Sequence, residues 1–336
     1  MSLRLIRNIV NTPSTLFSIL QNIKRQKQFL RQQIYPALEA ANKINDDSLD
    51  EQDFKKITHY YALAVPAILG EAICTLRGMP MSQQERIALT CQGAMTGLFD
   101  DFFDKRSLND EEVKNFMENH EGLNGRNASE QLFLTFYSKA FQHAHDSSLM
   151  LRYLRQVYEA QIESRKQALT GITKKEITDI TLLKGGVSVL FYRSVMVHSF
   201  LQNEEEAFYK LGGLMQLGND IFDIYKDRNG KIHTLATTAN KIADLRNMFC
   251  SMMNDSFEAI NQLSYPNKNR KKFLYLISMS FCSRCFVCLD QLEKKDKLTN
   301  GVFSLHQYSR KDLICDMDKK RNKWKSVCYH IGQLYK

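Results

Sequence analysis

The stretch from residue 211 to 234 constrains the local structure of this chain more tightly than any other. Asn219, Asp223 and Asp227 are four residues apart, so on an α-helix their side chains form one stripe, each about 6 Å further along the axis. Apolar residues recur around them at helical spacing: Leu214, Leu217, Ile221 and Ile224. The pair Asn229-Gly230 that follows is typical of a helix end. Three oxygen-bearing side chains on one face, two of them acidic, predict a helix that binds a divalent cation.

A second acidic cluster lies in the sequence GLFDDFFDKR, residues 97–106. Asp100 and Asp104 share a helical face, and Asp101 lies beside them. An acidic run of this kind is most often a solvated helix surface, but here apolar and aromatic side chains surround it. Because burying several uncompensated carboxylates is costly, we expect a cation to meet them, and Mg²⁺ is the natural candidate.

The order and spacing of the two clusters resemble the metal motifs of class I terpenoid synthases. Residues 100–104, DDFFD, match the DDxxD motif, and Asn219, Asp223 and Asp227 are similar to the second motif, N-x-x-x-S/T/D-x-x-x-D/E. Trans-prenyltransferases, with F-Q-x-x-D-D-x-x-D and then G-K-x-x-T, are also similar, but Asn219 replaces their first Asp. Squalene and phytoene synthases are similar as well, except that Phe222 replaces their Arg. The resemblance covers roughly residues 55–310.

The resemblance implies an all-α helical bundle around a central cavity and a cluster of Mg²⁺ ions, three in number, with Mn²⁺ as the alternative. The implied metal ligands are Asp100, Asp101, Asp104, Asn219, Asp223 and Asp227, and all of these except Asp101 are also implied catalytic residues. The ions would ionise a linear prenyl diphosphate, and the carbocation would cyclise to a terpene hydrocarbon or alcohol. The nearest subfamily is the tetraprenyl-β-curcumene synthase type.

Two alternatives remain open at this stage. The first is prenyl condensation, head-to-tail or head-to-head, and the second is a catalytically silent helical protein that binds isoprenoids. Elongation needs a second diphosphate site, which prenyltransferases build from a G-G-K-x-x-R segment and an Arg-Arg pair after the first motif. Residues 42–78 hold no such basic glycine motif, and Lys105-Arg106 is followed by a partly acidic stretch. Cyclisation is therefore favoured.

The resemblance also implies residues that contact the diphosphate: Lys184, Arg193, Lys231, Tyr308 and Arg310. Gly185-Gly186 lies beside Lys184 in an apolar stretch, and adjacent glycines predict a kink or break that frees backbone groups toward a cavity. Arg193 is a rival of Lys184, since Arg grips phosphate bidentately, although a structural salt bridge is its alternative role.

Further residues are expected to line the hydrocarbon cavity because they lie on or near the metal-bearing faces, or carry aromatic rings that would stabilise a carbocation. They are Gly93, Thr96, Phe99, Phe103, Gly185, Phe191, Gly212, Met215 and Gln216. Simple core packing is the alternative for most of the aromatic residues.

The chain as a whole predicts one helical domain over residues 41–336, preceded by a basic amphipathic segment over residues 1–40. Five prolines in 336 residues favour long helices, and no linker or internal repeat divides the chain. Eight cysteines without a secretion signal predict reduced thiols and a cytoplasmic protein. The net charge of +9 suits attraction of a diphosphate, while no nucleic-acid-binding module is recognisable. A homodimer is left open.

The first 33 residues contain six basic residues, and no acidic residue precedes Glu39. Apolar residues are interspersed with them, and Thr12-Pro13-Ser14 interrupts the pattern, which predicts two short amphipathic helices. The segment is too interrupted for a secretory signal or a transmembrane span. It either touches an anionic membrane peripherally or forms a helical cap packed on the domain.

Overall fold

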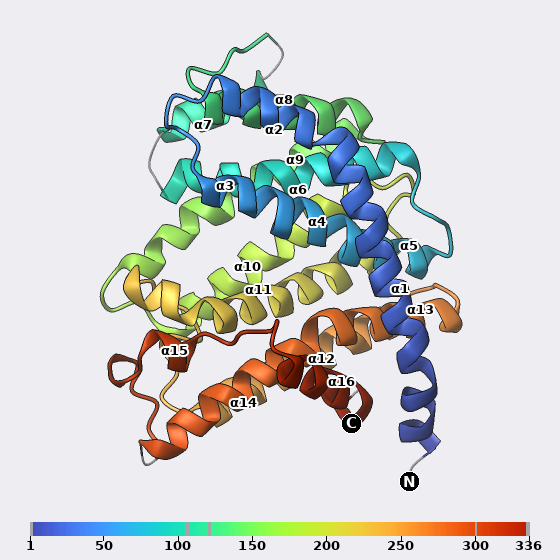
Figure 1. Ribbon diagram of the computed structural model, residues 1–336, viewed down its shortest axis with the longest axis vertical. Helices are drawn as coiled ribbons and strands as arrows, with labels where there is room; N and C mark the ends of the chain where they lie inside the picture. The colour runs from blue at the N-terminus through green and yellow to red at the C-terminus, as the bar shows by residue number, and fades with distance from the viewer. Residues whose placement is uncertain (1–2, 105–107, 120–121, 300, 334–336) are drawn as a thin grey trace. The chain divides into compact units, whose positions relative to one another are not determined.

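The computed structural model describes residues 3–104, 108–119, 122–299 and 301–333. Within these ranges every regular element is a helix and no strand occurs (Figure 1), so the all-α prediction is confirmed. The chain forms two compact units, which are described separately. Unit 1 contains residues 1–17, 162–190 and 200–336, and unit 2 contains residues 18–161 and 191–199. These units do not follow the sequence boundary at residue 40, and the division there stays a prediction.

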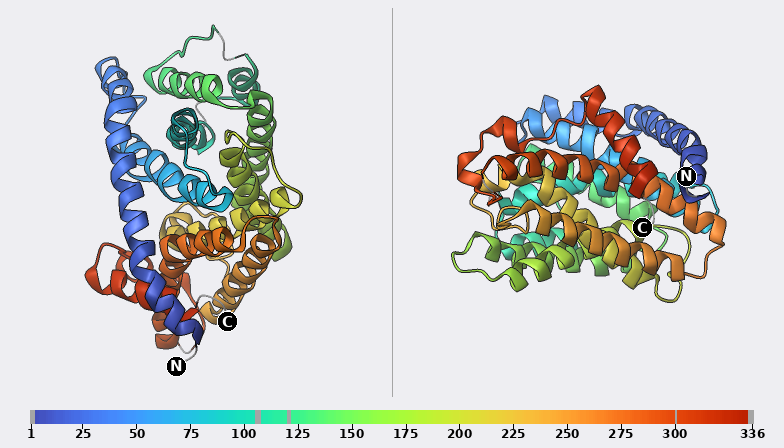
Figure 2. Two further views of the ribbon diagram at one scale, coloured as in Figure 1. Left: turned by 90° about the vertical axis from the view of Figure 1, so that its right-hand side faces the viewer. Right: turned by 90° about the horizontal axis from the view of Figure 1, so that it is seen from below.

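The first helix, α1 (Leu3–Gln33), is one continuous helix (Figure 2). Its residues up to Phe17 belong to unit 1, and those from Ser18 belong to unit 2. The prediction of two short helices was therefore wrong, because Pro13 lies inside the helix without ending it. Side chains beside the proline bond to the backbone of the preceding turn: Thr12 Oγ1 donates to Asn8 O at 2.7 Å, and Thr15 Oγ1 donates to Asn11 O at 2.9 Å. The helix therefore continues through Pro13 although the proline lacks a backbone N–H, with these side-chain bonds in the same turns.

Unit 2 is built around the helix that carries the first acidic motif, α6 (Gln83–Asp104). It packs most extensively against α8 (Ala128–His143). Five aromatic rings of the interior lie in contact with one another: Phe99, Phe102, Phe116, Phe133 and Tyr137. The other α-helices of this unit are α2 (Tyr35–Lys43), α3 (Glu51–Lys55), α4 (Ala62–Ala64), α5 (Glu71–Arg77), α7 (Asp110–Glu118) and most of α9 (Ser147–Ser164).

Between α3 and α5 the chain passes through two π-helical turns, η1 (Lys56–Tyr61) and η2 (Val65–Gly70). The η1 turn packs against α6, and an ideal Cβ built on Gly93 would lie only 2.7 Å from the Tyr61 carbonyl oxygen. Gly93 is thus required for close helix packing. Short π turns of this kind often occur near functional sites.

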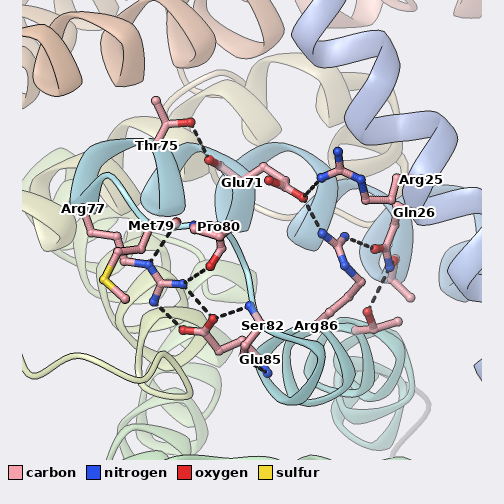
Figure 3. A network of polar contacts seen from close by, with 12 residues as sticks. Arg25, Gln26, Glu71, Thr75, Arg77, Met79, Pro80, Ser82, Glu85 and Arg86 are labelled. Carbon is pink, nitrogen blue, oxygen red and sulfur yellow. Dashed lines mark hydrogen bonds and ion pairs between the residues drawn. The ribbon is translucent and has the colours of Figure 1, made fainter.

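A polar network holds the start of α6 to α1 and α5 within unit 2 (Figure 3). Arg86 pairs with Glu71 and donates to Gln26 Oε1 at 3.0 Å, while Arg25 reaches Glu71 at 3.2 Å. Buried Glu85 pairs with Arg77 and accepts a hydrogen bond from Ser82 N at 2.8 Å. Burial acts to raise the pKa of Glu85, but these hydrogen bonds outweigh burial and lower it to about 2.

Unit 1 is organised around α11 (Glu204–Asn229), which packs mainly on α12 (Ile242–Gln262) and also contacts α14 (Ser283–Leu298). Its remaining elements are η3 (Arg165–Ala168), α10 (Lys174–Arg193, to residue 190), α13 (Asn267–Ile277), the π turn η4 (Ser278–Cys282), η5 (Leu305–Gln307), α15 (Arg310–Leu313) and α16 (Lys320–Gln333).

The glycine pair in α10 does not break the helix, so the expected kink was wrong. Helix α10 continues without interruption through Gly185 and Gly186. An ideal Cβ on Gly185 would lie 2.1 Å from the Gly212 carbonyl oxygen, and a Cβ on Gly212 would meet the Gly185 carbonyl at the same distance. The glycines therefore allow the backbones of α10 and α11 to touch.

Within the described ranges, two helical stretches are long and apolar enough to cross a membrane by length and composition, Glu51–Arg77 and Asn267–Leu298. Of their most apolar windows, 56% and 78% of the residues are buried inside the protein. Core helices share this character, so the two stretches are weak evidence for a membrane span.

Candidate functional site: two acidic helices

The second acidic motif lies in the last turns of α11, which ends at Asn229 as the sequence predicts. Asn219 is exposed, whereas Asp223 and Asp227 are half-buried. Gly230 has an ordinary negative φ, and the left-handed residue after the helix is Lys231, with φ of 55°. This end of α11 thus presents carboxylates that are partly removed from water.

These carboxylates repel one another. Burial raises the pKa of Asp223. Burial, followed by the charges of Asp220 and Asp223, raises the pKa of Asp227 to about 7, although Lys226 and Lys184 act to lower it. A raised pKa means that the negative charge is poorly compensated in the folded protein. Binding a cation at this face would relieve that cost.

Asp220 belongs to this acidic face, and the sequence reasoning did not include it. Its side chain is 4% exposed and accepts hydrogen bonds from Gln216 Nε2 at 2.8 Å and from Thr181 Oγ1 at 3.5 Å. Burial raises its pKa to about 6 in spite of these bonds. The signal was present in the sequence, because Asp220, Asp223 and Asp227 follow the i, i+3, i+7 spacing of one helical face.

Among the expected diphosphate ligands, Lys184 lies near this face, since its charge lowers the pKa of both Asp220 and Asp227. The segment after α14 also packs on the end of α11. There, Arg228 donates to Tyr308 O at 2.7 Å, and the Arg310 guanidinium lies 5.9 Å from the centre of the Tyr225 ring. Tyr308 itself is buried, with its hydroxyl 2.6 Å from Thr299 Oγ1. Lys231 and Arg310 are exposed cations: Lys231 follows the end of α11 by two residues, and Arg310 lies beside Tyr225 of α11.

The first acidic motif, in unit 2, holds Asp100 in a polar environment at the end of α6. Its carboxylate accepts a hydrogen bond from Gln161 Nε2 and one from the Tyr61 hydroxyl at 3.5 Å. Tyr192 hydrogen-bonds Thr96 Oγ1 at 2.9 Å. Burial raises the pKa of Tyr192; the Thr96 hydrogen bond lowers it, and the charge of Asp100 raises it further. Asp104 is the last residue of α6, and its side chain lies outside the described residues.

Asp101 has a different partner from Asp100, and its role as a metal ligand stays a prediction. The residue is 5% exposed, and its carboxylate pairs with Lys56 Nζ at 2.6 Å, while Lys56 Nζ also lies 3.6 Å from the Asp53 carboxylate. Burial and then a hydrogen bond between the Asp101 and Asp53 carboxyl groups raise the pKa of Asp101, and Lys56 lowers it. Its cation is therefore a lysine of the same unit.

Arg193 takes a structural role, so the expectation that it binds diphosphate is not supported. Its side chain is fully buried at the end of α10, where its guanidinium donates to His198 O at 3.0 Å and to Ser199 O at 3.2 Å. The alternative that the sequence left open, a structural role, is the better description, with backbone carbonyls in place of a carboxylate.

Several expected cavity residues are packing residues. Phe99 and Phe103 are buried in contact with each other, with ring centroids 5.2 Å apart, and Phe191 is buried against Tyr192. Gly93, Gly185 and Gly212 lie at close helix contacts rather than at open space. Three further residues are half-buried: Thr96, Met215 and Gln216. Thr96 hydrogen-bonds with Tyr192, and Gln216 donates to Asp220.

Among the residues that the structure describes, no three His, Cys, Asp or Glu side chains are grouped closely enough to hold a metal ion. The fit to Mg²⁺ therefore depends on the chemistry of the donors in each helix. On α11 the donors are hard carboxylate oxygens with excess negative charge, which suit Mg²⁺, and on α6 the Asp100 carboxylate accepts hydrogen bonds from Gln161 and Tyr61.

No protein-family model matches the chain, and no curated protein matches it. Among solved structures, the chain is similar to a dehydrosqualene synthase crystallised in complex with a ligand. The two chains share 12% sequence identity over 94% of this chain and 97% of that chain, with a TM-score of 0.46. Function is accordingly inferred from the residues of this chain.

Proposed function

We propose that the protein is a metal-dependent enzyme of the class I terpenoid synthase type, which ionises a linear prenyl diphosphate and cyclises the resulting carbocation. The observation that carries the proposal is the acidic face of α11, where burial and mutual repulsion raise the pKa of Asp220 to about 6 and of Asp227 to about 7. Such a cost is expected at a binding or catalytic site and is otherwise a burden on stability.

When bound, Mg²⁺ would act as a Lewis acid that neutralises the diphosphate leaving group. The donors of this chain would be Asp223 and Asp227, joined by Asn219, whose exposed amide oxygen lies one turn earlier. In this scheme Lys184, which already lowers the pKa of Asp227, binds the diphosphate as a further cation. The proposal also keeps Asp100 and Asp104 of the first motif as metal ligands, as the sequence predicts.

The polar groups beside Asp100 have a supporting role in this proposal. Gln161 and Tyr61 donate to Asp100 and fix the orientation of its carboxylate. Tyr192 is protonated at neutral pH, as an ordinary tyrosine is, and burial raises its pKa further, so its hydroxyl can donate a hydrogen bond. Positioning of this kind preserves the geometry of a metal ligand before the substrate arrives.

Product analysis tests the proposal directly. The protein is incubated with allylic diphosphates of C10 to C35 chain length and Mg²⁺, with and without excess chelator, and products are separated by gas chromatography and identified by mass spectrometry. A hydrocarbon or terpene alcohol formed from one allylic diphosphate alone, and lost in the chelator, supports cyclisation.

The same assay with labelled isopentenyl diphosphate separates the alternatives. A longer linear diphosphate as the main product would establish head-to-tail condensation and overturn cyclisation. A head-to-head product of two allylic diphosphates would establish the squalene synthase type of reaction. Absence of diphosphate release with every substrate would leave only a silent isoprenoid-binding protein.

A further inference from the structure

Helix α1 buries polar side chains on its inner side. Asn8 is 2% exposed, donates to Ile331 O at 2.9 Å and accepts from the Tyr275 hydroxyl at 2.8 Å. Further along, Gln26 is fully buried and donates to Ala62 O and Thr90 Oγ1, both at 2.9 Å. These bonds satisfy the buried groups, so polar contacts contribute to holding α1 on the protein.

The outer side of α1 carries exposed apolar side chains. Five of them are large and exposed: Ile6 (42%), Ile9 (43%), Val10 (69%), Phe17 (64%) and Leu20 (64%). At about 100° per residue, these positions fall within an arc of about 100°, and they extend for about 21 Å along the axis. The five residues are called the outer stripe. An apolar stripe turned to solvent over a polar buried side is the reverse of an ordinary surface helix.

The charged residues of α1 are all positive. Lys24, Lys27 and Arg31 are exposed and continue the same arc toward the end of the helix, and Arg7 is exposed beside the stripe. Helix α1 contains no acidic residue. An occupant of this face must therefore accept apolar side chains and supply negative charge.

We propose that the outer stripe of α1 docks on the surface of an anionic lipid bilayer. In this arrangement Phe17, Leu20 and the aliphatic residues enter the headgroup and acyl boundary, and Lys24, Lys27 and Arg31 meet lipid phosphates. A second copy of the chain is less well matched, because it would bring a second set of cations and no negative charge from α1. This inference goes beyond the proposed function and does not depend on it.

Vesicle co-sedimentation without substrate tests the proposal. The full chain is mixed with vesicles of phosphatidylcholine, alone or with phosphatidylglycerol, at low and high salt. We expect binding to the anionic vesicles only, weakened at high salt. The triple variant Val10→Ser, Phe17→Ser, Leu20→Ser should weaken binding by about tenfold or more, and Lys24→Glu, Lys27→Glu, Arg31→Glu should do the same.

The matched control is Leu169→Ser, because Leu169 is 60% exposed but lies outside α1. It should leave vesicle binding unchanged, and circular dichroism should show that all variants keep the helical content of the wild type. Equal loss of binding in the control would overturn the proposal, as would wild-type protein that stays in the supernatant with anionic vesicles. Sedimentation velocity tests whether a second copy of the chain binds the outer stripe instead. If the wild type is a dimer that does not bind vesicles, and the Ser triple variant is a monomer, the outer stripe is a dimer interface.

Discussion

The two acidic helices look alike in sequence but differ in how their charges are compensated. On α6, Asp101 is paired with Lys56 at 2.6 Å and Asp100 accepts hydrogen bonds from Gln161 and Tyr61. On α11, Asp227 has a pKa raised to about 7 by burial and by the charges of Asp220 and Asp223. Burial raises the pKa of Asp101 too, but its carboxylate has a lysine at 2.6 Å, whereas the carboxylate of Asp227 lies near two further carboxylates, whose charges raise its pKa.

This difference shows that a motif letter does not fix the role of a side chain. Asp101 is a predicted ligand and Asp220 lies beside one, and both residues are buried. Asp220 adds to the repulsion on the acidic face of α11, whereas Asp101 pairs with a lysine. We therefore expect cation binding to depend most strongly on α11 and least on Asp101.

Turnover gives the largest contrast between the two helices. Asp223→Ala and Asp227→Ala should each lower diphosphate release by roughly 10²-fold or more, because each removes a charged contact to the leaving-group cations. Asp101→Asn should change it by less than about threefold, since its partner is Lys56. The steady-state rate of diphosphate release at saturating Mg²⁺ measures the turnover of all three variants.

Asp244→Asn on α12 is the matched control, because Asp244 is an exposed acid outside both motifs. Its activity should equal that of the wild type. A loss in Asp101→Asn as large as that in Asp223→Ala would contradict the contrast and return Asp101 to the metal ligands.

The pH dependence of stability is the second contrast. A carboxyl whose pKa is raised from 3.8 to about 7 holds its proton more tightly in the folded protein, so stability is highest at low pH and falls as pH rises from about 4 to 7. In chelator, Asp227→Asn should therefore be more stable than the wild type at pH 8, by roughly 2 kcal/mol after allowance for partial exposure, but not at pH 4.

Urea unfolding at pH 4 and pH 8 measures this difference. The comparison uses wild type minus variant, because buried His330, whose pKa burial lowers to about 4, acts in the opposite direction between pH 4 and 6.5. Added Mg²⁺ should stabilise the wild type at pH 8 more than Asp227→Asn. Equal pH profiles for the two proteins would show that the α11 charge is compensated after all.

Sequence reasoning identified what local spacing can encode. The helical class, the end of α11 at Asn229 and the shared face of Asp223 and Asp227 follow from periodicity and from a stop signal. Asp220 was missed, although its spacing to Asp223 and Asp227 contained the information.

The features that the sequence did not predict depend on contacts between residues that are distant in the chain. Lys56 lies 45 positions before Asp101, and no pattern in the sequence links them. Adjacent glycines such as Gly185 and Gly186 are compatible with a kink or with close helix packing. The close approach of the Gly212 carbonyl to Gly185 shows that packing is the outcome here. Likewise, Pro13 can end a helix or lie inside one, and the rest of α1 determines the result.

The smallest expected effect concerns the stability of the α6 cluster. Lys56→Met removes the cation shared by two buried carboxylates, Asp53 and Asp101, so it should lower the free energy of unfolding by about 1 to 2 kcal/mol at pH 7. It would also make α6 resemble α11, with repulsion between buried acids. Adding Asp101→Asn to this variant should recover part of the loss, because one of the two charges is gone.

Lys55→Met is the control for this cycle, because Lys55 and Glu51 form an exposed pair, whose loss should cost less than about 0.5 kcal/mol. Urea unfolding measures the free energy of unfolding of Lys56→Met, of Lys55→Met and of the double variant Lys56→Met, Asp101→Asn. If Lys56→Met were no more costly than Lys55→Met, Lys56 would not compensate Asp101. If Asp101→Asn gave no recovery in the Lys56→Met background, the cost would come from lost packing of the lysine chain rather than from charge. Recovery would place the difference between the helices in one residue, Lys56 of η1, which pairs with Asp101 of α6.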